Sequence, residues 1–169
     1  MFGMEAKPTT DRAAQLRVHI RWMIRRDLPE VLQIEEDGFE FPWTEREIMD
    51  ALRQQNCIGM VAEQGERVVG FMIYKLYPKH LHLVSLAVAR DCQRRGVGRL
   101  MVDKLVEKLT RQRRVRITLE TRETNLAAQL FFRSQGFRAT AVFHEFYADS
   151  PEDAYLMVYR PQDLVGVGE

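Results

Sequence analysis

Three arginines and two glycines fall within residues 91–100, DCQRRGVGRL, directly before a long amphipathic stretch. Glycine destabilises a helix interior by roughly 0.5–1 kcal/mol relative to alanine, so helix propensity argues against Gly96 and Gly98 at this position. The first N–H groups of a helix lack an acceptor within the helix and carry a partial positive charge. A phosphate group approaches such N–H groups closely where side chains are missing, and guanidinium groups add charge-assisted hydrogen bonds. We therefore predict a binding site for a bulky anion such as a diphosphate.

Two common phosphate-binding patterns do not fit this segment. A nucleoside-triphosphate loop places Lys-Ser or Lys-Thr after its second glycine, whereas this chain has Arg99 and Leu100 there. A dinucleotide-binding loop requires a third glycine, where this chain has Met101. A tightly packed helix start that binds no ligand remains as an alternative explanation of the glycines.

Length and composition limit the class of protein. The chain has 169 residues, 46% hydrophobic and 29% charged, which predicts one domain with a sizeable core. Its net charge of +1 gives no general attraction to nucleic acid or to an anionic membrane, so we expect neither as a partner. The two cysteines, Cys57 and Cys92, lack C-x-x-C spacing and favour reduced thiols in a cytoplasmic protein. No apolar stretch approaches the ~20 residues that span a bilayer.

The elements that must position the glycine segment alternate between strand and helix periodicity. Thr44 and Glu47 match a capping box, Asp27 is placed to cap the helix before it, and Gly136 is placed to end the last helix. The order predicts an α/β fold with a mixed sheet. The expected elements are a strand over 17–24, helices over 27–38 and 44–55, strands over 57–63, 68–77 and 80–88, a helix over 97–111, a strand over 115–121, a helix over 125–136, and strands over 139–147 and 153–160.

The segment LAVARDCQRRGVGRLMVDKL resembles the Q/R-x-x-G-x-G/A signature of the GCN5-related N-acetyltransferase (GNAT) family, whose members use acetyl-coenzyme A. Three further stretches, FPWTE, LETRETNLAAQLFFRSQGF and FYADSPEDAYLM, resemble a subgroup that acetylates the N-terminal alanine of a ribosomal protein. The resemblance covers residues 18–159. It implies a mixed central sheet of about seven strands with flanking helices and strands splayed apart at the acetyl-coenzyme A site. The expected domain covers 17–161, between an N-terminal tail over 1–16 and a C-terminal tail over 162–169.

The same resemblance assigns residues to the coenzyme. The pantetheine arm would lie along the strand before the glycine segment, and the diphosphate would bind at the helix start. Asn125 would contact the coenzyme arm, although a plain N-cap role accounts for an asparagine there as well. The implied contacts are Leu86, Ala87, Val88, Arg94, Arg95, Gly96, Val97, Gly98, Arg99, Asn125 and Phe132.

Glu120 matches the general base of the family, with a surface ion pair to Arg122 as its alternative role. Phe132 departs from the pattern, because related enzymes have there a tyrosine that protonates the leaving thiolate. A thiol with a pKa near ~8.5 is a tolerable leaving group, so losing this acid slows the reaction without abolishing it. Tyr147 would serve as a substitute acid or line the groove for the acceptor.

Phe41 and Trp43 would border that acceptor groove, with core packing as the alternative. His80 and His82 are two residues apart and so share one face of the expected strand. No cysteine or carboxylate lies near them in the sequence, so we expect no metal. The predicted function is direct transfer of acetyl from acetyl-coenzyme A to a protein N-terminal α-amine, with a ribosomal protein as the expected substrate and a monomer or weak dimer as the expected state. A small-molecule amine, a lysine side chain, or an acetyl-coenzyme A-binding module with little catalysis are the alternatives.

Overall fold

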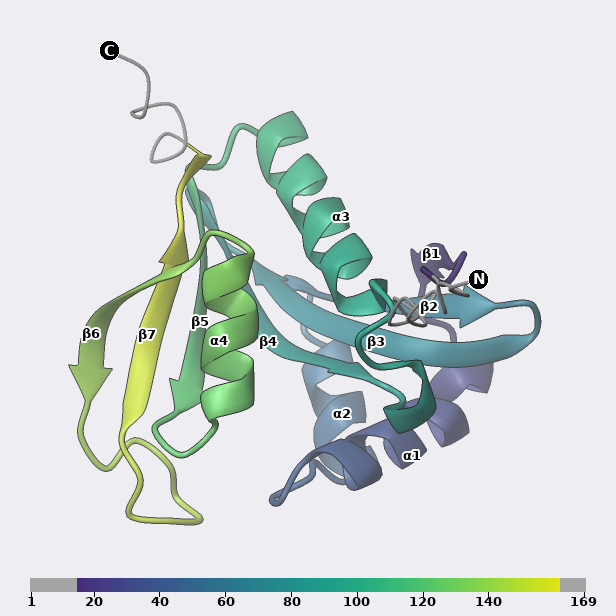
Figure 1. The fold of residues 1–169 in the computed structure, drawn as a ribbon, viewed down its shortest axis with the longest axis horizontal. Helices are drawn as coiled ribbons and strands as arrows, with labels where there is room; N and C mark the ends of the chain where they lie inside the picture. Colours follow the sequence, from purple (N-terminus) through teal and green to yellow (C-terminus); the bar gives the residue numbers. More distant parts are fainter. Residues whose placement is uncertain (1–14, 162–169) are drawn as a thin grey trace, which may run out of the picture.

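A computed structural model describes residues 15–161 of the chain (Figure 1). Seven strands form one mixed sheet in the order β1-β2-β3-β4-β5-β7-β6, which confirms the expected fold. Most of the two expected terminal tails lies outside the described residues. The elements are β1 (His19–Trp22), η1 (Arg25–Asp27), α1 (Leu28–Gly38), α2 (Glu45–Leu52), β2 (Cys57–Gln64), β3 (Arg67–Leu76), β4 (His80–Val88), η2 (Arg90–Cys92), α3 (Val97–Arg111), β5 (Arg116–Arg122), α4 (Leu126–Ser134), β6 (Arg138–Phe143) and β7 (Ala154–Tyr159).

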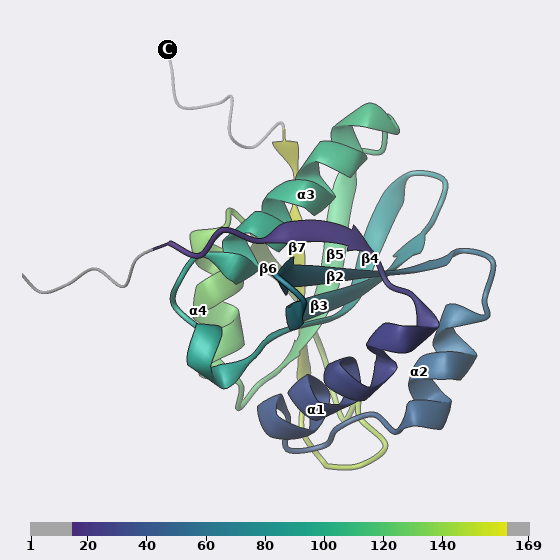
Figure 2. The same cartoon turned by 90° about the vertical axis from the view of Figure 1, so that its right-hand side faces the viewer.

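The helices cover the two faces of the sheet and enclose two separate apolar cores. Figure 2 shows α1 and α2 on one side of the strands and α3 on the other. On the α3 side, Met101, Leu105 and Leu109 pack with Leu81 and Ile117, and the α4 residue Phe132 joins the same core. On the α1 side, helix and strand residues form the second core, which includes Val31, Ile34, Ile48, Phe71 and Ile73. The spacing of these apolar residues follows the helix and strand periods read from the sequence.

The sheet opens between β4 and β5. These two strands pair in parallel over only three residues each, from His80 with Arg116 to His82 with Thr118. They then diverge, as Figure 1 shows, so within the described residues the β5-facing edge of β4 has no strand partner after His82. A bulge in β4 lies at the same place, because Ser85 and Leu83 face consecutive residues of β3 and Val84 between them has no partner. The expected splay is therefore present.

Several local expectations are confirmed. The Thr44 hydroxyl accepts the N–H of Glu47, whose carboxylate accepts the N–H of Thr44, so α2 begins with the predicted capping box. The β4 and α3 boundaries agree with the sequence prediction. Gly136 adopts a left-handed φ of 94° directly after α4, as the C-terminal position of a helix favours.

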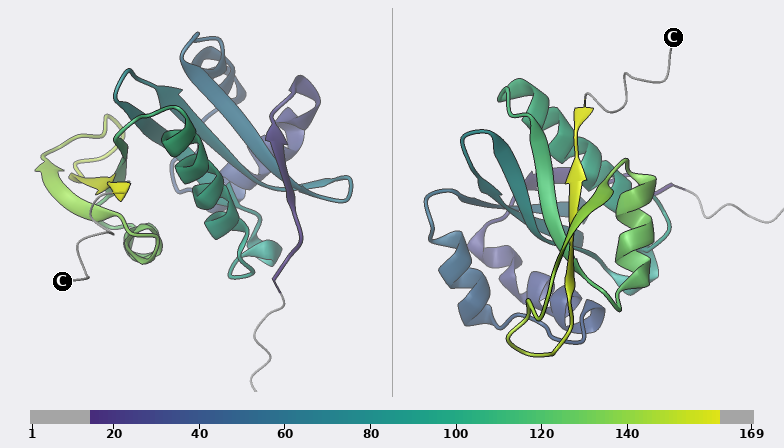
Figure 3. Two further views of the ribbon diagram at one scale, coloured as in Figure 1. Left: turned by 90° about the horizontal axis from the view of Figure 1, so that it is seen from above. Right: turned by 90° about the vertical axis from the view of Figure 1, so that its left-hand side faces the viewer.

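Other expectations are corrected. Asp27 does not cap α1 with its side chain; the buried carboxylate instead accepts the N–H of Ile24 and pairs with Arg21 at 2.8 Å. The hydrogen bonds from Arg21, opposed by burial, hold the Asp27 pKa below its usual range. The strand expected over 139–147 ends at Phe143, because residues 144–153 leave the sheet as a loop (Figure 3). The carboxylate of Asp153 holds the start of this loop by accepting the N–H of Glu145.

Candidate active site

The glycine segment forms the start of α3. Gly96 has a left-handed φ of 85°, and Arg94 two residues earlier has a φ of 58°. The N–H of Leu100 donates to the Gly96 carbonyl at 3.0 Å, so the three N–H groups before it precede the helical ladder. Successive N–H groups in such a turn make a concave site for an anion. The backbone therefore has the form that the sequence predicts for a diphosphate site.

A cavity of about 470 Å³, which we call the coenzyme cavity, lies against this segment. Of the residues that the family resemblance assigns to the coenzyme, all line this cavity except Arg95, Asn125 and Phe132. Arg95 does not line it, and its carbonyl accepts the N–H of the buried Leu16 at 3.0 Å. The unpartnered edge of β4, at 86–88, forms one wall, and α4 forms another through Ala127, Leu130 and Phe131.

Gly96 and Gly98 are required for different structural reasons. Gly96 has a backbone conformation that side-chain-bearing residues rarely adopt. At Gly98 a Cβ atom would lie 3.1 Å from the Cζ atom of Phe131, so this glycine lets α3 approach α4. Tight packing therefore explains Gly98, and it does so at a position that also lines the coenzyme cavity.

A second cavity, of about 190 Å³, lies where β4 and β5 diverge, and we call it the gap cavity. It is lined from both sides of the sheet: Leu119 and Phe132 belong to the core beneath α3, whereas Trp43 packs on the core beneath α1. Leu86 lines both cavities. The remaining predicted site residues also meet here, namely Phe41, Trp43, Glu120, Asn125, Phe132 and Tyr147.

Glu120 does not pair with Arg122, the alternative that the sequence left open. Its Oε2 atom lies 2.9 Å from Nε2 of His82, and Nδ1 of His82 lies 2.7 Å from Oγ1 of Thr118. With Glu120 ionised, the arrangement is satisfied by a neutral His82 that accepts from the Thr118 hydroxyl and donates to the carboxylate. The sequence left the face of His82 open between solvent and the acceptor cleft, and only the β4–β5 register places it beside Glu120.

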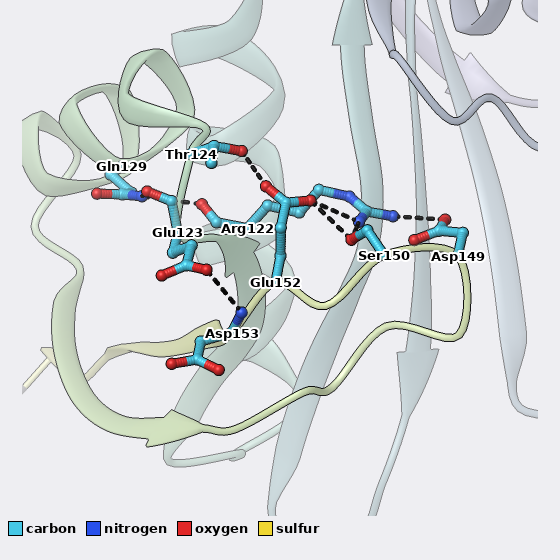
Figure 4. Close-up of polar contacts among 8 residues, drawn as sticks. All are labelled: Arg122, Glu123, Thr124, Gln129, Asp149, Ser150, Glu152 and Asp153. Carbon is cyan, nitrogen blue, oxygen red and sulfur yellow. Dashed lines mark hydrogen bonds and ion pairs between the residues drawn. The ribbon is translucent and has the colours of Figure 1, made fainter.

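Arg122 lines the gap cavity and contacts two loops, and Figure 4 shows its polar contacts with the loop of Asp149 and Glu152. We call residues 39–44 the aromatic loop and residues 144–153 the acidic loop. The Arg122 guanidinium donates to Asp149 at 2.7 Å and to Glu152 at 3.0 Å, both in the acidic loop. Its Cζ atom lies 3.8 Å from the ring centroid of Tyr147 and 4.7 Å from that of Phe41. Hydrogen bonds from Arg122 lower the pKa of Asp149, and those from Thr124 and Ser150 lower the pKa of Glu152.

Tyr147 lines the gap cavity, and burial makes its phenol a weak proton donor. Burial raises its pKa to about 12, with the charge of Arg122 acting in the opposite direction. A phenol of that pKa is a weaker acid than a thiol, whose pKa is near ~8.5, and proton donors work best with a pKa near the operating pH. The cation–π contact with Arg122 holds the ring at the cavity wall.

Glu35 of α1 is a site residue that the sequence analysis missed. It is 4% exposed and lines the gap cavity, and its Oε1 atom accepts the N–H of Trp43 at 3.0 Å. This bond fixes the aromatic loop on α1. Burial raises the Glu35 pKa, while the Trp43 N–H and the nearby Ser85 hydroxyl oppose the rise.

Asn125 caps α4 by accepting the N–H of Ala128 at 3.1 Å, as its alternative role predicts.

The remaining candidates lie apart from this chemistry. Both cysteines are buried, and burial raises the pKa of each thiol, which makes them poor nucleophiles. His80 stacks on Tyr77, with ring centroids 4.6 Å apart, at the other end of β4 from the coenzyme cavity. Over residues 15–161, none of the helices combines the length and the apolar character that crossing a bilayer requires.

Comparison with known proteins agrees with this geometry. Residues 20–137 match the model of the acetyltransferase (GNAT) family. The [ribosomal protein bS18]-alanine N-acetyltransferase of Salmonella typhimurium is 31% identical over 133 residues, which cover 78% of this chain and 89% of that protein. The crystal structure of the ribosomal-protein-S18-alanine N-acetyltransferase from Escherichia coli superposes with a TM-score of 0.77 at 27% identity, covering 85% of this chain and 94% of that one.

A third match shares the fold at lower identity. Arabidopsis thaliana NAA60, solved in complex with acetyl-coenzyme A, has a TM-score of 0.75 and 18% identity, covering 85% of this chain and 99% of that one. The family model covers more than half of the sequence, and the solved structures named above share the fold. The chain belongs to the acetyltransferase (GNAT) family.

Proposed function

We propose that this acetyltransferase transfers acetyl from acetyl-coenzyme A to the N-terminal α-amine of a protein, with a ribosomal protein as substrate in the cytoplasm. The observation that carries the proposal is the gap cavity, which passes between β4 and β5 and is lined from both faces of the sheet. The relatives named for N-terminal alanine acetylation of a ribosomal protein support this choice of acceptor.

The residues present fit the coenzyme. The turn at 94–96 offers a concave arrangement of N–H groups, and the exposed side chains of Arg94 and Arg99 lie beside it. The free edge of β4 offers backbone donors and acceptors to an extended pantetheine arm, as an added strand would use them. When bound, acetyl-coenzyme A supplies an acetyl thioester, and residues 86–88 would orient it toward the gap cavity.

On the other side of the gap, Glu120 accepts the proton that the amine loses when it attacks. His82 holds the carboxylate in place and leaves it as the acceptor at the end of the Thr118–His82–Glu120 chain. Phe41, Trp43 and Tyr147 form an aromatic wall against which the first residues of a peptide pack. Proximity of amine and thioester supplies a large part of the acceleration, so no covalent enzyme intermediate is needed.

The test is an acceptor panel with release of free thiol as the readout. Short peptides that begin with Ala, Ser or Met are compared with the same peptides blocked at the N-terminus and carrying an internal lysine, and with a polyamine. We expect release only with the free N-termini, and mass spectrometry should place the acetyl group on the α-amine. Transfer to the blocked peptides or to the polyamine alone contradicts the proposal. Coenzyme binding without transfer to any acceptor identifies a binding module instead.

A further inference from the structure

Two buried polar side-chain atoms lack hydrogen-bond partners among the described residues, and both belong to residues that line the gap cavity. They are Oε2 of Glu35 and Oγ1 of Thr121. Buried polar groups are nearly always paired, because leaving one unpaired loses the hydrogen bond it made to water. Their occurrence together in one cavity indicates that the cavity wall is built to receive a ligand.

Thr121 faces the coenzyme side of the gap. Side chains alternate along β5, so Leu119 and Thr121 point to one face of the sheet, and Glu120 and Arg122 point to the other. Leu119 belongs to the core beneath α3, which also includes Phe132. Thr121 is 5% exposed and shares the cavity wall with Asn125 and Phe132 of the α4 region.

Of the other side chains on that wall, Asn125 has its oxygen engaged at the start of α4, so its amide group is a donor but no hydroxyl. The Phe132 ring carries no polar atom, and its edge packs against Phe131 and Phe137. The Tyr147 ring lies against the Arg122 guanidinium. Because Arg122 and Thr121 point to opposite faces of β5, Tyr147 is on the other side of the sheet from Thr121. Ser85 lies beside the Glu35 carboxylate. The free hydroxyl on the coenzyme side is therefore that of Thr121.

We propose that Thr121 is a catalytic residue whose hydroxyl donates a hydrogen bond to the sulfur of the acyl donor. The inference rests on the proposed function. The amine lone pair forms the new N–C bond, and the C–S bond breaks with its electron pair moving to sulfur. The amine proton goes to Glu120. Thr121 keeps its own proton and stabilises the thiolate through an O–H···S⁻ hydrogen bond.

The first test measures the thiol of bound coenzyme A, without turnover. Thiolate absorbance in the ultraviolet is followed against pH for coenzyme A bound to the wild type, to Thr121→Val and to Thr121→Ser. A hydrogen bond to a charged group is strong enough to alter the pKa of the bound thiol by about 1–2. We expect the wild type and Thr121→Ser to hold this pKa low and Thr121→Val to raise it. An unchanged thiol pKa in Thr121→Val overturns the inference.

The second test uses stability and turnover together. Valine has the shape of threonine without the hydroxyl, so Thr121→Val removes an unpaired buried polar atom and should raise the melting temperature slightly. The same variant should lower kcat by about 10- to 100-fold, with KM for acetyl-coenzyme A unchanged. A purely structural hydroxyl would give a lower melting temperature and an unchanged kcat, which contradicts the inference.

Thr110→Val is the matched control, because it removes from α3 an exposed hydroxyl that donates to the Val106 carbonyl. It should leave the thiol pKa and kcat at the wild-type values. Calorimetry of the wild type with coenzyme A distinguishes failure of the proposed function from failure of the role proposed for Thr121. If the wild type binds no coenzyme A, the proposed function fails and this inference fails with it. If it binds and Thr121→Val behaves as the wild type does, the inference alone fails.

Discussion

The coenzyme cavity and the acceptor side of the gap cavity are lined by different kinds of groups. On the coenzyme side the turn at 94–96, the start of α3 and the free edge of β4 offer main chain from one short stretch of sequence, and α4 adds apolar side chains. On the acceptor side the wall is side chains from two loops, joined by Arg122 across 27 and 30 residues of sequence to Asp149 and Glu152. The first wall depends on backbone conformation and volume, and the second on charge pairs. Substitutions should therefore affect the two sides separately.

The largest expected effect is at the point where the two sides meet. Glu120→Gln keeps the shape of the side chain and removes the proton acceptor, so kcat should fall by about 10²- to 10⁴-fold. Coenzyme A binding measured by calorimetry should be unchanged, because Glu120 is on the acceptor face of β5. Glu66→Gln, in the exposed turn between β2 and β3, is the control and should retain full kcat. A Glu120→Gln variant with wild-type kcat would show that another group takes the proton.

A substitution on the coenzyme side should affect coenzyme binding alone. Gly98→Val forces a side chain against Phe131, where even a Cβ atom would lie 3.1 Å from the ring, and so displaces the start of α3. Overpacking destabilises a fold by about 1–3 kcal/mol. Because the displaced helix start carries the N–H groups of the diphosphate site, coenzyme A binding in a calorimetric titration should weaken by at least about tenfold.

Gly38→Ala tests whether the Gly98 effect is specific, because Gly38 also lines the coenzyme cavity but a Cβ atom there would have no described neighbour within 4 Å. This control should bind coenzyme A as the wild type does. Equal loss of binding in both variants would mean that the cavity lining, and not the packing of α3 on α4, sets the affinity.

A substitution on the acceptor side should weaken peptide binding and leave coenzyme A binding unchanged. Arg122→Met removes the ion pairs to the acidic loop and the cation contacts with Phe41 and Tyr147, so the two loops lose their connection. Misplaced substrate-positioning groups reduce the rate steeply, and we expect KM for the peptide to rise at least about tenfold with coenzyme A affinity unchanged. Arg138→Met, an exposed arginine on β6, should leave peptide KM unaltered. Steady-state kinetics with each substrate varied in turn distinguishes these outcomes.

The same contrast explains what the sequence could predict. The β4 and α3 boundaries, the Thr44 capping box and the glycine turn follow from local periodicity and backbone chemistry, so they were predictable from neighbouring residues. The contact between His82 and Glu120 depends on the register of two strands far apart in sequence. The Glu35–Trp43 bond and the Arg122 connection also depend on how loops fold over the sheet, and no local pattern indicates them. The end of β6 at Phe143 was missed for the same reason, because the acidic loop is held by Asp153 and Arg122.

A gain of function is expected at Phe132, on the coenzyme side. Phe132→Tyr adds a phenol to the wall that carries Thr121, and general acids contribute most when no other donor serves the leaving group. The rise in kcat should therefore be less than about tenfold in the wild-type background and larger in Thr121→Val. Additive effects in a double-mutant cycle on kcat would indicate that the two hydroxyls do not serve the same atom. Phe143→Tyr, at an exposed phenylalanine on β6, is the matched control and should leave kcat unchanged.

The smallest predicted effect is the share of the pH dependence of stability that the acceptor side contributes. The pKa values of Asp149 and Glu152 are held below their ordinary values in the folded protein, by Arg122 foremost for Asp149 and by the Thr124 and Ser150 hydroxyls for Glu152. Groups with a lowered folded pKa stabilise the protein above their unfolded pKa and lose that contribution as pH falls through the folded pKa. The melting temperature should therefore decrease as pH drops below about 5. In Arg122→Met the decrease should be shallower, since Asp149 loses the main cause of its shift while Glu152 keeps its hydroxyl partners. Equal slopes in the two proteins, measured by calorimetric melts at matched ionic strength, would mean that Arg122 contributes nothing to holding the acidic loop.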